Sequence, residues 1–411
     1  MRFIGRRSGK DWSYKLNILS ILNRRQELFQ DDIEENIHKI SSKIKDGRFL
    51  VIGGAGSIGS QLVKELFLYD PKVLHVVDLS ENGLVELVRQ LRSTTGYGNG
   101  DFRALPLDVG SNIFDAFIAT SSGYDYILNL SALKHVRSEK DPFTLMRLIE
   151  VNIFNAVKLA RLANKCKASY FVISTDKAAN PVNLMGASKK LMEKFLHNSD
   201  FSMVTMSRFA NVAFSEGSLL QSFKARFNEL QPIVAPCDVE RYFITPRESG
   251  RLCLLATLLG QNGEIFVPKK NDELKLTRFS DVAQRFIESM GYEIHLCRSE
   301  EEARKSIAND ISNKRWPLYL FESDTTGEKM YEEFYTSDEH VDEKKFKDVG
   351  VISCKKLNSH QQARLFKFED AIRGIVESDL EWKKEDIVNI FTEALPELNY
   401  ADHGKYLDEK M

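Results

Sequence analysis

A glycine-rich loop that directly follows an apolar run constrains the fold of this chain more than any other feature. The run Phe49–Ile52 has the composition of a buried strand, spaced glycines follow at positions 53, 56 and 59, and a helical pattern begins at Gln61. In this order, glycines permit a tight turn, a close approach of the backbone to a pyrophosphate and close packing of helix on strand. The helix N-terminus adds free N–H groups and a positive dipole end. We therefore predict a dinucleotide site whose phosphate loop contains Gly53, Gly56, Ser57, Ile58 and Gly59.

Alternating strand-like and helix-like segments continue from this loop. Five further apolar runs are typical of buried strands, at residues 73–77, 102–106, 126–130, 170–174 and 203–209. Helical periodicity lies between them, at residues 61–68, 83–91, 113–119, 143–163 and 185–196. Parallel strands need crossover connections of this kind. The pattern predicts an α/β fold, a doubly wound Rossmann-type parallel sheet with helices on both faces.

The length of 411 residues allows about two to three domains. We predict an N-terminal helical extension at residues 1–47, a dinucleotide-binding Rossmann domain with a catalytic segment at 48–213, a smaller mixed α/β substrate-binding region at 214–345 and a C-terminal helical region at 346–411. Apolar residues between Trp12 and Leu22 have roughly helical spacing, which predicts a short amphipathic helix. We interpret this helix as docking on this chain or on a second subunit, with a membrane-surface role as the alternative.

Composition narrows the class of partner and the compartment. The 57 Lys and Arg residues nearly balance the 59 Asp and Glu residues, so no global basic field favours nucleic acid. No run approaches the roughly 20 apolar residues of a membrane span, which predicts no integral membrane segment. The five cysteines are scattered, without CxxC pairs or His at metal-ligand spacing, and the N-terminus lacks a signal-peptide pattern. We predict a cytoplasmic protein without a metal site.

The ends of the second and third strands predict contacts to the adenosine half of the cofactor. Asp78 lies about 20 residues after the loop, where a carboxylate can accept hydrogen bonds from ribose hydroxyls. Leu79 rather than an Arg follows it, so NAD is favoured over NADP, whose 2′-phosphate would meet negative charge. Asp108 and Val109 could reach the adenine, although an Asp at the start of such a loop is more often a helix cap.

The segment after the fifth strand carries the most specific pattern. It contains Thr175, Asp176 and Lys177, followed by Met185 and Lys189. In short-chain dehydrogenase/reductase proteins a Tyr four residues before a Lys performs acid/base chemistry, and here Met185 occupies the tyrosine position. Further motifs lie at residues 131–136, 208–212, 216–218, 241–245, 263–267 and 327–333. Together they resemble the nucleotide-sugar 4,6-dehydratases of capsular polysaccharide biosynthesis, extended short-chain dehydrogenase/reductases of the UDP-N-acetylglucosamine type in which this Met variant occurs.

The resemblance implies roles for individual residues. Asp176 is expected as the acid and Lys177 as the base, because an adjacent acid and amine at a strand end suit the removal of a C5 proton and of the C6 hydroxyl. Thr175 and Lys189, beside Met185, would organise the C4 hydroxyl and the nicotinamide. Further cofactor contacts are expected from Ser131, Ala132, Lys134 and Lys189. Substrate contacts are expected from Lys134, His135, Asn211, Ser218 and Arg241.

The favoured hypothesis is therefore NAD-dependent 4,6-dehydration of a UDP-N-acetylhexosamine, by an enzyme that the resemblance expects to be a homo-oligomer. A nucleotide-sugar 4-epimerase or 4-reductase is the nearest alternative. Neither reaction expels the C6 hydroxyl, and both usually rely on the tyrosine that Met185 replaces. A non-catalytic NAD-binding regulator is a third hypothesis, which the intact Asp176, Lys177 and Lys189 disfavour.

Overall fold

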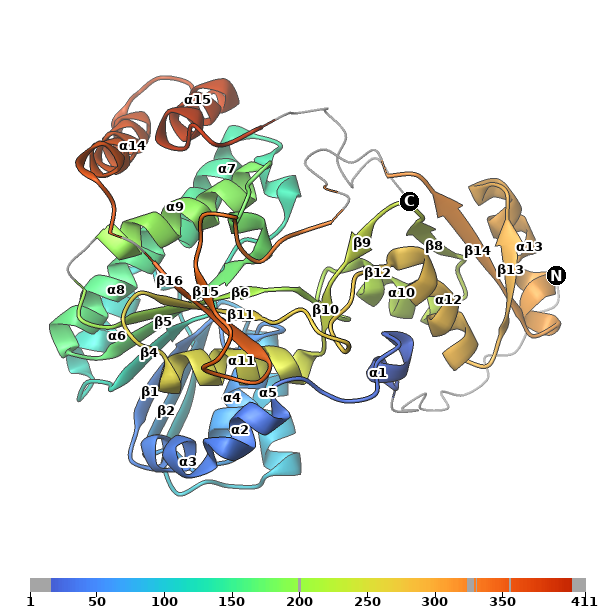
Figure 1. The fold of residues 1–411 in the computed structure, drawn as a ribbon, viewed down its shortest axis with the longest axis horizontal. Helices are drawn as coiled ribbons and strands as arrows, with labels where there is room; N and C mark the ends of the chain where they lie inside the picture. Colours follow the sequence, from blue (N-terminus) through green and yellow to red (C-terminus); the bar gives the residue numbers. More distant parts are fainter. Residues whose placement is uncertain (1–15, 199–200, 324–328, 330, 355, 401–411) are drawn as a thin grey trace.

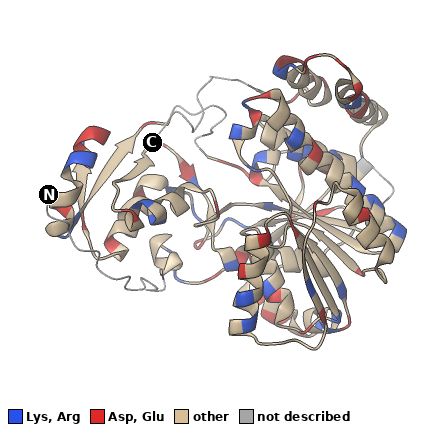
Figure 2. Ribbon diagram, turned by 180° about the vertical axis from the view of Figure 1, so that it is seen from behind, with Lys and Arg blue, Asp and Glu red and all other residues tan. Residues whose placement is uncertain are grey.

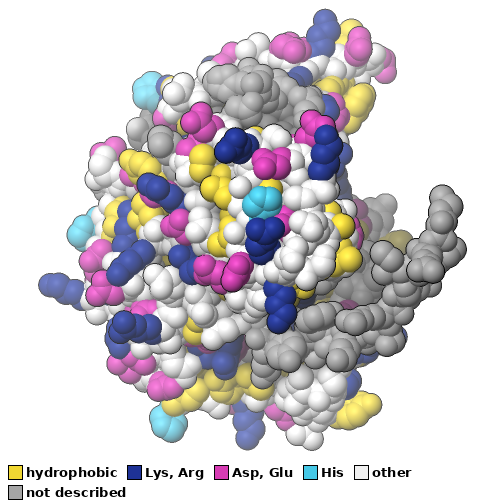
Figure 3. Space-filling model, turned by 90° about the vertical axis from the view of Figure 1, so that its right-hand side faces the viewer, with side chains coloured by type: hydrophobic (Ala, Val, Ile, Leu, Met, Phe, Trp, Pro, Cys, Tyr) yellow, Lys and Arg dark blue, Asp and Glu magenta, His cyan; other side chains and the backbone are white. Residues whose placement is uncertain are grey.

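The computed structural model describes residues 16–198, 201–323, 329, 331–354 and 356–400. These residues form a larger lobe around a nine-stranded sheet and a smaller lobe beside it (Figure 1). Lys and Arg residues are interspersed with Asp and Glu residues along the ribbon of both lobes (Figure 2), and side chains of both charges are scattered over the described part of the face in Figure 3. Among the described residues, no helix combines the length and apolar character that crossing a membrane requires.

The main sheet has the strand order β15-β16-β11-β6-β5-β4-β1-β2-β3. All six predicted strands are present, as β1 Arg48–Ile52, β2 Val73–Asp78, β3 Asp101–Pro106, β4 Tyr126–Asn129, β5 Ser169–Thr175 and β6 Val204–Phe209. They pair in parallel, and the strand order reverses between β1 and β4. The carboxyl ends of strands at such a switch point form the crevice in which open α/β sheets bind ligands.

The sheet extends beyond the predicted boundary at residue 213. β11 Glu264–Pro268 pairs in parallel with β6, and β16 Val349–Ser353 and β15 Val341–Asp342 add antiparallel strands at that edge. β11 is buried along its whole length, as expected of an interior strand. The segments predicted as the substrate region and the C-terminal helical region therefore both contribute strands to the sheet of the larger lobe.

Helices cover both faces of the sheet, which confirms the doubly wound prediction. α4 Gly59–Phe67, α5 Glu81–Thr94 and α11 Pro246–Leu259 lie on one side, and α8 Asn155–Cys166 and α9 Leu184–Asn198 lie on the other (Figure 1). α6 Asn112–Thr120 connects β3 to β4. The strands and helices form one large apolar core.

The prediction of one continuous α-helix at residues 143–163 was wrong in one respect. α7 Pro142–Ile149 passes through one π-helical turn, Glu150–Phe154, before α8 begins. Within this turn Asn152 accepts a hydrogen bond from the Leu133 N–H (3.0 Å) and donates to the Leu133 carbonyl (2.9 Å) and the Ser188 hydroxyl (3.0 Å). Single π-helical turns of this kind within α-helices are frequent at functional sites. Here the turn fixes the loop after β4 to α9.

The smaller lobe has its own sheet and core. β8 Ile233–Pro236, β14 Arg315–Phe321 and β13 Glu293–Cys297 run parallel, packed by α10 Leu219–Asn228, α12 Phe279–Ser289 and α13 Glu300–Ser312. Trp316 is fully buried and stacks on Phe227 with ring centroids 4.2 Å apart. Two short ribbons lie near the junction of the lobes, β7 Asn211–Val212 with β10 Phe243–Ile244 and β9 Glu240–Arg241 with β12 Thr277–Arg278.

The chain ends add helices to both lobes. α1 Ile18–Ile21 packs on α12 of the smaller lobe, whereas α2 Gln30–Glu35 and α3 Ile37–Lys45 pack on α11 of the larger one. Trp12 and Tyr14 of the predicted amphipathic helix lie outside the described residues. At the other end, α14 Ser359–Glu377 and α15 Lys384–Ala394 lie against α9 (Figure 1).

Candidate active site

A cleft of about 600 Å³ lies at the carboxyl ends of β1, β4, β5 and β6. Four of its lining segments follow these strands, and a fifth leads into α10. The cleft brings together most of the predicted site residues, namely Gly53, Gly56, Ser57, Ile58, Gly59, Ala132, Lys134, His135, Thr175, Asp176, Lys177, Met185, Lys189, Asn211 and Ser218. Residues predicted from distant parts of the sequence thus share one cavity.

The glycine loop forms a tight cradle at the N-terminus of α4. Gly53 has a φ of +73°, which favours glycine, and a Cβ there would lie 2.6 Å from the Ser131 nitrogen. A Cβ on Gly59 would lie 2.0 Å from the Gly53 carbonyl oxygen. The backbone segments therefore approach so closely that Gly53 and Gly59 have no room for a side chain. The N-terminus of α4 faces the cleft. This geometry fits a dinucleotide pyrophosphate.

Five predicted residues lie outside the cleft lining: Asp78, Asp108, Val109, Ser131 and Arg241. The Asp78 carboxylate accepts hydrogen bonds from the backbone N–H groups of Ala55 (2.9 Å) and Ser80 (2.9 Å), so it lies directly against the glycine loop. Asp108 accepts from the Gly110 N–H (2.8 Å), as expected of a loop-turn residue, and Val109 is buried. The Ser131 hydroxyl donates to the Asn129 side chain (2.7 Å).

Thr175, Asp176 and Lys177 form one hydrogen-bonded group where β5 ends. The Asp176 carboxylate accepts from the Thr175 hydroxyl (2.9 Å), the Lys177 N–H (2.9 Å) and the Lys177 ammonium (3.2 Å), all at Oδ1. The Asp176 side chain is 4% exposed and the Lys177 side chain 23% exposed. The Asp176 carboxylate is thus almost enclosed, whereas the Lys177 side chain is partly exposed in the cleft. Such an arrangement can exchange protons with a ligand in the cleft.

Met185 and Lys189 lie on α9 behind this group. The Lys189 Nζ donates to the Ile173 carbonyl (3.0 Å). Burial lowers the pKa of Lys189 to about 7. Met185 is 3% exposed, and its thioether carries no exchangeable proton.

The loop before α10 lines another part of the cleft and bonds to two of the other loops. The Glu216 N–H donates to the Ser57 hydroxyl (2.8 Å), and the Glu216 carbonyl accepts from Lys134 Nζ (2.6 Å). Burial lowers the pKa of Lys134 and also that of His135, which lies near the positive charges of Lys134 and Arg137. The glycine loop, the loop after β4 and the loop before α10 are therefore joined around the cavity.

A fourth segment, residues 329 and 331–339, packs over Thr175–Lys177, which we call the candidate catalytic turn; we call the segment the cover. The Glu332 carboxylate lies 3.9 Å from Lys177 Nζ and 3.7 Å from Lys329 Nζ, and Asn180 donates to Glu333 (2.9 Å). Arg241, predicted to contact substrate, is buried and donates from NH1 to the Lys329 carbonyl (2.9 Å). The sequence motif at 327–333 indicated this segment without indicating its contact with Lys177.

Buried ion pairs anchor the cover to the larger lobe. Arg208 forms paired hydrogen bonds with Glu193 of α9 (2.9 and 2.8 Å) and with Glu339 of the cover (2.8 and 2.7 Å). It also donates to the Phe334 carbonyl (3.0 Å). The Arg208 side chain is 1% exposed, and the paired carboxylates hold its pKa above the ordinary value against the effect of burial.

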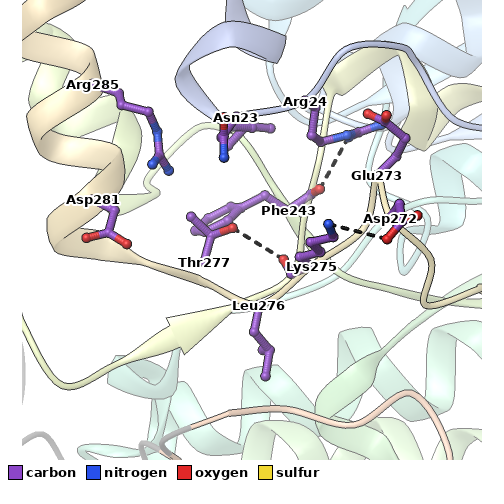
Figure 4. Close-up of a pocket in the computed structure, with 11 residues that line it drawn as sticks. Asn23, Arg24, Phe243, Asp272, Glu273, Lys275, Leu276, Thr277, Asp281 and Arg285 are labelled. Carbon is purple, nitrogen blue, oxygen red and sulfur yellow. Dashed lines mark hydrogen bonds and ion pairs between the residues drawn. The ribbon is translucent and has the colours of Figure 1, made fainter.

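A second cavity, of about 140 Å³, lies where residues 22–24 meet the smaller lobe (Figure 4). Arg285 of α12 points into it and donates to the Ile21 carbonyl (2.6 Å), while Arg24 pairs with the fully buried Glu248. Charged side chains of both signs line this cavity, including Asp281 and Lys275. None of the predicted site residues lies in it.

The parallel sheet, its switch point and the glycine loop define a protein of the Rossmann-type α/β class. More narrowly, the chain belongs to a family described as polysaccharide biosynthesis proteins, whose model matches residues 49–354. An uncharacterized membrane protein of Methanocaldococcus jannaschii is 30% identical over 76% of this chain and 87% of its own length. The capsular polysaccharide biosynthesis protein CapD of Staphylococcus aureus is 31% identical over 76% of this chain. The chain spans about half of the CapD length, 49%.

Other relatives carry different activities in their names. A UDP-glucose 4-epimerase of Rickettsia bellii is 31% identical over 54% of this chain and 66% of its own length. Among solved structures, Pen from Bacillus thuringiensis has a TM-score of 0.61 at 24% identity, covering 75% of this chain and 88% of its own. A dTDP-glucose 4,6-dehydratase from Bacillus anthracis, solved with NAD, has a TM-score of 0.53 at 14% identity, covering 71% and 88%. These two structures share the fold.

Proposed function

We propose that this protein is an NAD-dependent 4,6-dehydratase of a UDP-N-acetylhexosamine, with UDP-N-acetylglucosamine as the first candidate substrate, acting in surface polysaccharide or glycan biosynthesis. One observation carries the proposal: Asp176 and Lys177 are in contact at a cleft whose tyrosine position holds Met185. A 4-epimerase needs a group that moves one proton at the C4 hydroxyl. An adjacent acid and amine are suited to elimination, which needs a base at C5 and an acid at the C6 hydroxyl.

The glycine cradle and Asp78 beside it support NAD as the cofactor. When bound, NAD would accept the hydride from C4 and return it to C6. Gly53, Gly56 and Gly59 would hold the pyrophosphate by close backbone approach, and the Asp78 carboxylate would accept hydrogen bonds from the ribose hydroxyls. Lys189 contacts the nicotinamide half. Because an unpaired 2′-phosphate would meet the Asp78 charge, NAD is preferred over NADP.

The sugar lies between the candidate catalytic turn and the loop before α10. Thr175 orients the C4 hydroxyl, Lys177 removes the C5 proton, and Asp176 donates a proton to the departing C6 hydroxyl. Lys134, His135, Asn211 and Ser218 contact the nucleotide sugar from other parts of the cleft. Enclosure of Asp176, 4% exposed, keeps bulk water from competing for its proton.

The test is mass spectrometry of purified protein incubated with NAD and UDP-N-acetylglucosamine, without added reductant. We expect a product lighter by one water. Asp176→Asn and Lys177→Met should each lower turnover by about two to four orders of magnitude while NAD binding is retained, as expected of general acid/base residues. Lys224→Met, on α10 and outside the cleft lining, serves as the matched control and should turn over like wild type.

An unchanged mass accompanied by a C4-epimerised sugar would replace the dehydratase proposal with epimerisation. Wild-type turnover in either variant would remove Asp176 or Lys177 from the acid/base roles. Both outcomes are visible in the same assay, because the substrate and its epimer have equal mass but separate by chromatography.

A further inference from the structure

The proposed reaction needs one more proton acceptor than the roles assigned above provide. Oxidation at C4 releases the hydroxyl proton, and elimination then removes the C5 proton. Two protons are consumed later, one as the C6 hydroxyl leaves as water and one when C5 is protonated again. The hydride removed from C4 returns to C6, so no electrons remain on the protein. For part of the cycle the site must therefore hold two additional protons.

The residue at the tyrosine position cannot hold either of them. A tyrosine can take a proton on its phenolate oxygen, whereas the Met185 thioether is only a weak hydrogen-bond acceptor. Lys177 accepts one proton at a time. Asp176 must begin the elimination as an acid, so it is not available as the acceptor for the C4 hydroxyl.

Glu332 of the cover lies next to this pair. Its side chain is 3% exposed, and its Oε1 is 3.9 Å from Lys177 Nζ. Asp176 Oδ1 lies 3.2 Å from the same nitrogen. Its Oε2 accepts no hydrogen bond from any residue that the structure describes, and the ammonium of Lys329 lies 3.7 Å from it, beyond hydrogen-bond distance. A buried carboxylate oxygen that accepts no hydrogen bond has room to take a proton.

The main charges around Glu332 come from three segments. Lys177 and Asp176 face it from the candidate catalytic turn, Lys329 from the cover and Arg241 from β9. Burial raises the pKa of Glu332, and Asp176 adds to this, while Lys177, Lys329 and Arg241 act in the opposite direction. The carboxyl is therefore not held as a fully paired carboxylate, in contrast to Glu339, whose pKa Arg208 lowers to about 2.

We propose that Glu332 is the proton relay of Lys177, and that it holds the proton released from the C4 hydroxyl during elimination. This inference rests on the proposed function. Transfer of one proton within the Asp176–Lys177 pair leaves Asp176 as the acid and Lys177 as a neutral amine. Lys177 then takes the C4 hydroxyl proton and passes it to the Glu332 carboxylate, and is free to take the C5 proton. Asp176 loses its proton to the departing water, Lys177 returns its proton to C5, and Glu332 restores the proton of Asp176 through Lys177. A transfer distance of 3.9 Å shortens to a hydrogen bond by a small movement of the Lys177 side chain, as often happens when substrate binds.

The experiment compares Glu332→Gln with Glu333→Gln. Both changes replace a carboxylate with an amide of the same shape on neighbouring residues of the cover, and the amide oxygen introduced by Glu333→Gln can still accept from Asn180. For Glu332→Gln we expect a turnover about 10- to 100-fold lower, a sugar-nucleotide KM within about twofold of wild type, and loss of the acidic limb of the kcat–pH profile. Glu333→Gln should keep the acidic limb of the kcat–pH profile. Glu332→Asp, which retains a carboxylate, should show part of that limb.

A second readout needs no substrate. Infrared spectra of wild type recorded against pH should contain a buried carboxylic acid band that titrates above the usual range of glutamate, that is lost in Glu332→Gln and retained in Glu333→Gln. Identical pH profiles and turnover in the two variants, or no band that depends on Glu332, would overturn the relay. If wild type dehydrates nothing yet shows the band, the proposed function fails while the proton-holding carboxyl stands.

Discussion

The floor of the cleft and its cover are built in different ways. The floor consists of the glycine loop and the turns after β4 and β5, which meet because parallel strands end at the same edge. The cover reaches the floor through contacts such as that of Asn180 with Glu333, 153 positions away in the chain. Backbone geometry holds the floor, whereas charged side chains hold the cover. We therefore expect substitutions in the floor to affect chemistry and those beneath the cover to affect stability and proton balance.

The largest effect should come from removing the cation that anchors the cover. Arg208→Met leaves the carboxylates of Glu193 and Glu339 close together without their shared partner. Breaking a buried ion pair from one side typically costs about 3–5 kcal/mol, and we expect that loss of unfolding free energy in chemical denaturation at pH 7. Adding Glu193→Gln and Glu339→Gln should recover much of it.

The matched control is Arg304→Met on α13, whose partner Glu300 is in an exposed i, i+4 pair. Such pairs contribute about 0.3–0.5 kcal/mol. If Arg208→Met were as mild as this control, the view that ion pairs hold the cover would be wrong.

A smaller, pH-dependent effect on stability is expected at Lys189, which lies on α9 and donates to the Ile173 carbonyl beside the floor. The native pKa of Lys189 is lowered to about 7 by burial, below the value of about 10.4 for an unfolded lysine. Between these values the unfolded state binds more protons, so this residue makes wild-type stability rise with pH and fall toward pH 7. Lys189→Met lacks this dependence and should be more stable than wild type below pH 7, by about 1–3 kcal/mol, although inactive.

Denaturation at several pH values between 6 and about 10 measures this difference. The advantage of Lys189→Met should shrink as the pH rises. Lys190→Met is the neighbouring control; Lys190 lies 3.7 Å from Glu339 and supports the cover, so its loss should not stabilise the protein at any pH. A variant at position 189 that is less stable than wild type at pH 6 would show that the lysine contributes to folding as well as to the site.

The sequence predicted the floor better than the cover for a physical reason. Glycine spacing, strand ends and helix starts are local signals, and the parallel sheet converts them into one site. Hence Gly53, Asp176 and Lys189 could be placed together from the sequence alone. The motif that contains Glu332 is visible in the sequence, but its contact with Lys177 depends on how distant segments pack.

Two further differences have the same origin. Arg241 has the residue type expected at a diphosphate, yet it is buried and donates to the Lys329 carbonyl beneath the cover. The π-helical turn at Glu150–Phe154 has no periodicity signal, because it depends on the bonds of Asn152 to Leu133 and Ser188. In each case a polar side chain forms hydrogen bonds with residues that are distant in the chain, and the spacing of residues in the sequence does not specify these partners.

The smallest predicted effect concerns the edge of the floor, where Asp78 lies against the glycine loop. Asp78→Asn keeps an oxygen that can accept from the Ala55 N–H, loses the second oxygen, which accepts from the Ser80 N–H, and removes the charge that the ribose hydroxyls and a 2′-phosphate would meet. A hydrogen bond to a charged group contributes about 1.5–3 kcal/mol, so we expect the Kd of NAD to rise about 10- to 100-fold and that of NADP to change less or to fall. Asp70→Asn is the matched control, since Asp70 precedes β2 at the opposite end of the strand and accepts from Asn99 (2.7 Å). Calorimetric titration of NAD and NADP into both variants distinguishes cofactor selection by Asp78 from structural support of the loop. An equal loss of NAD and NADP affinity in Asp78→Asn would mean that the carboxylate supports the loop and does not select the cofactor.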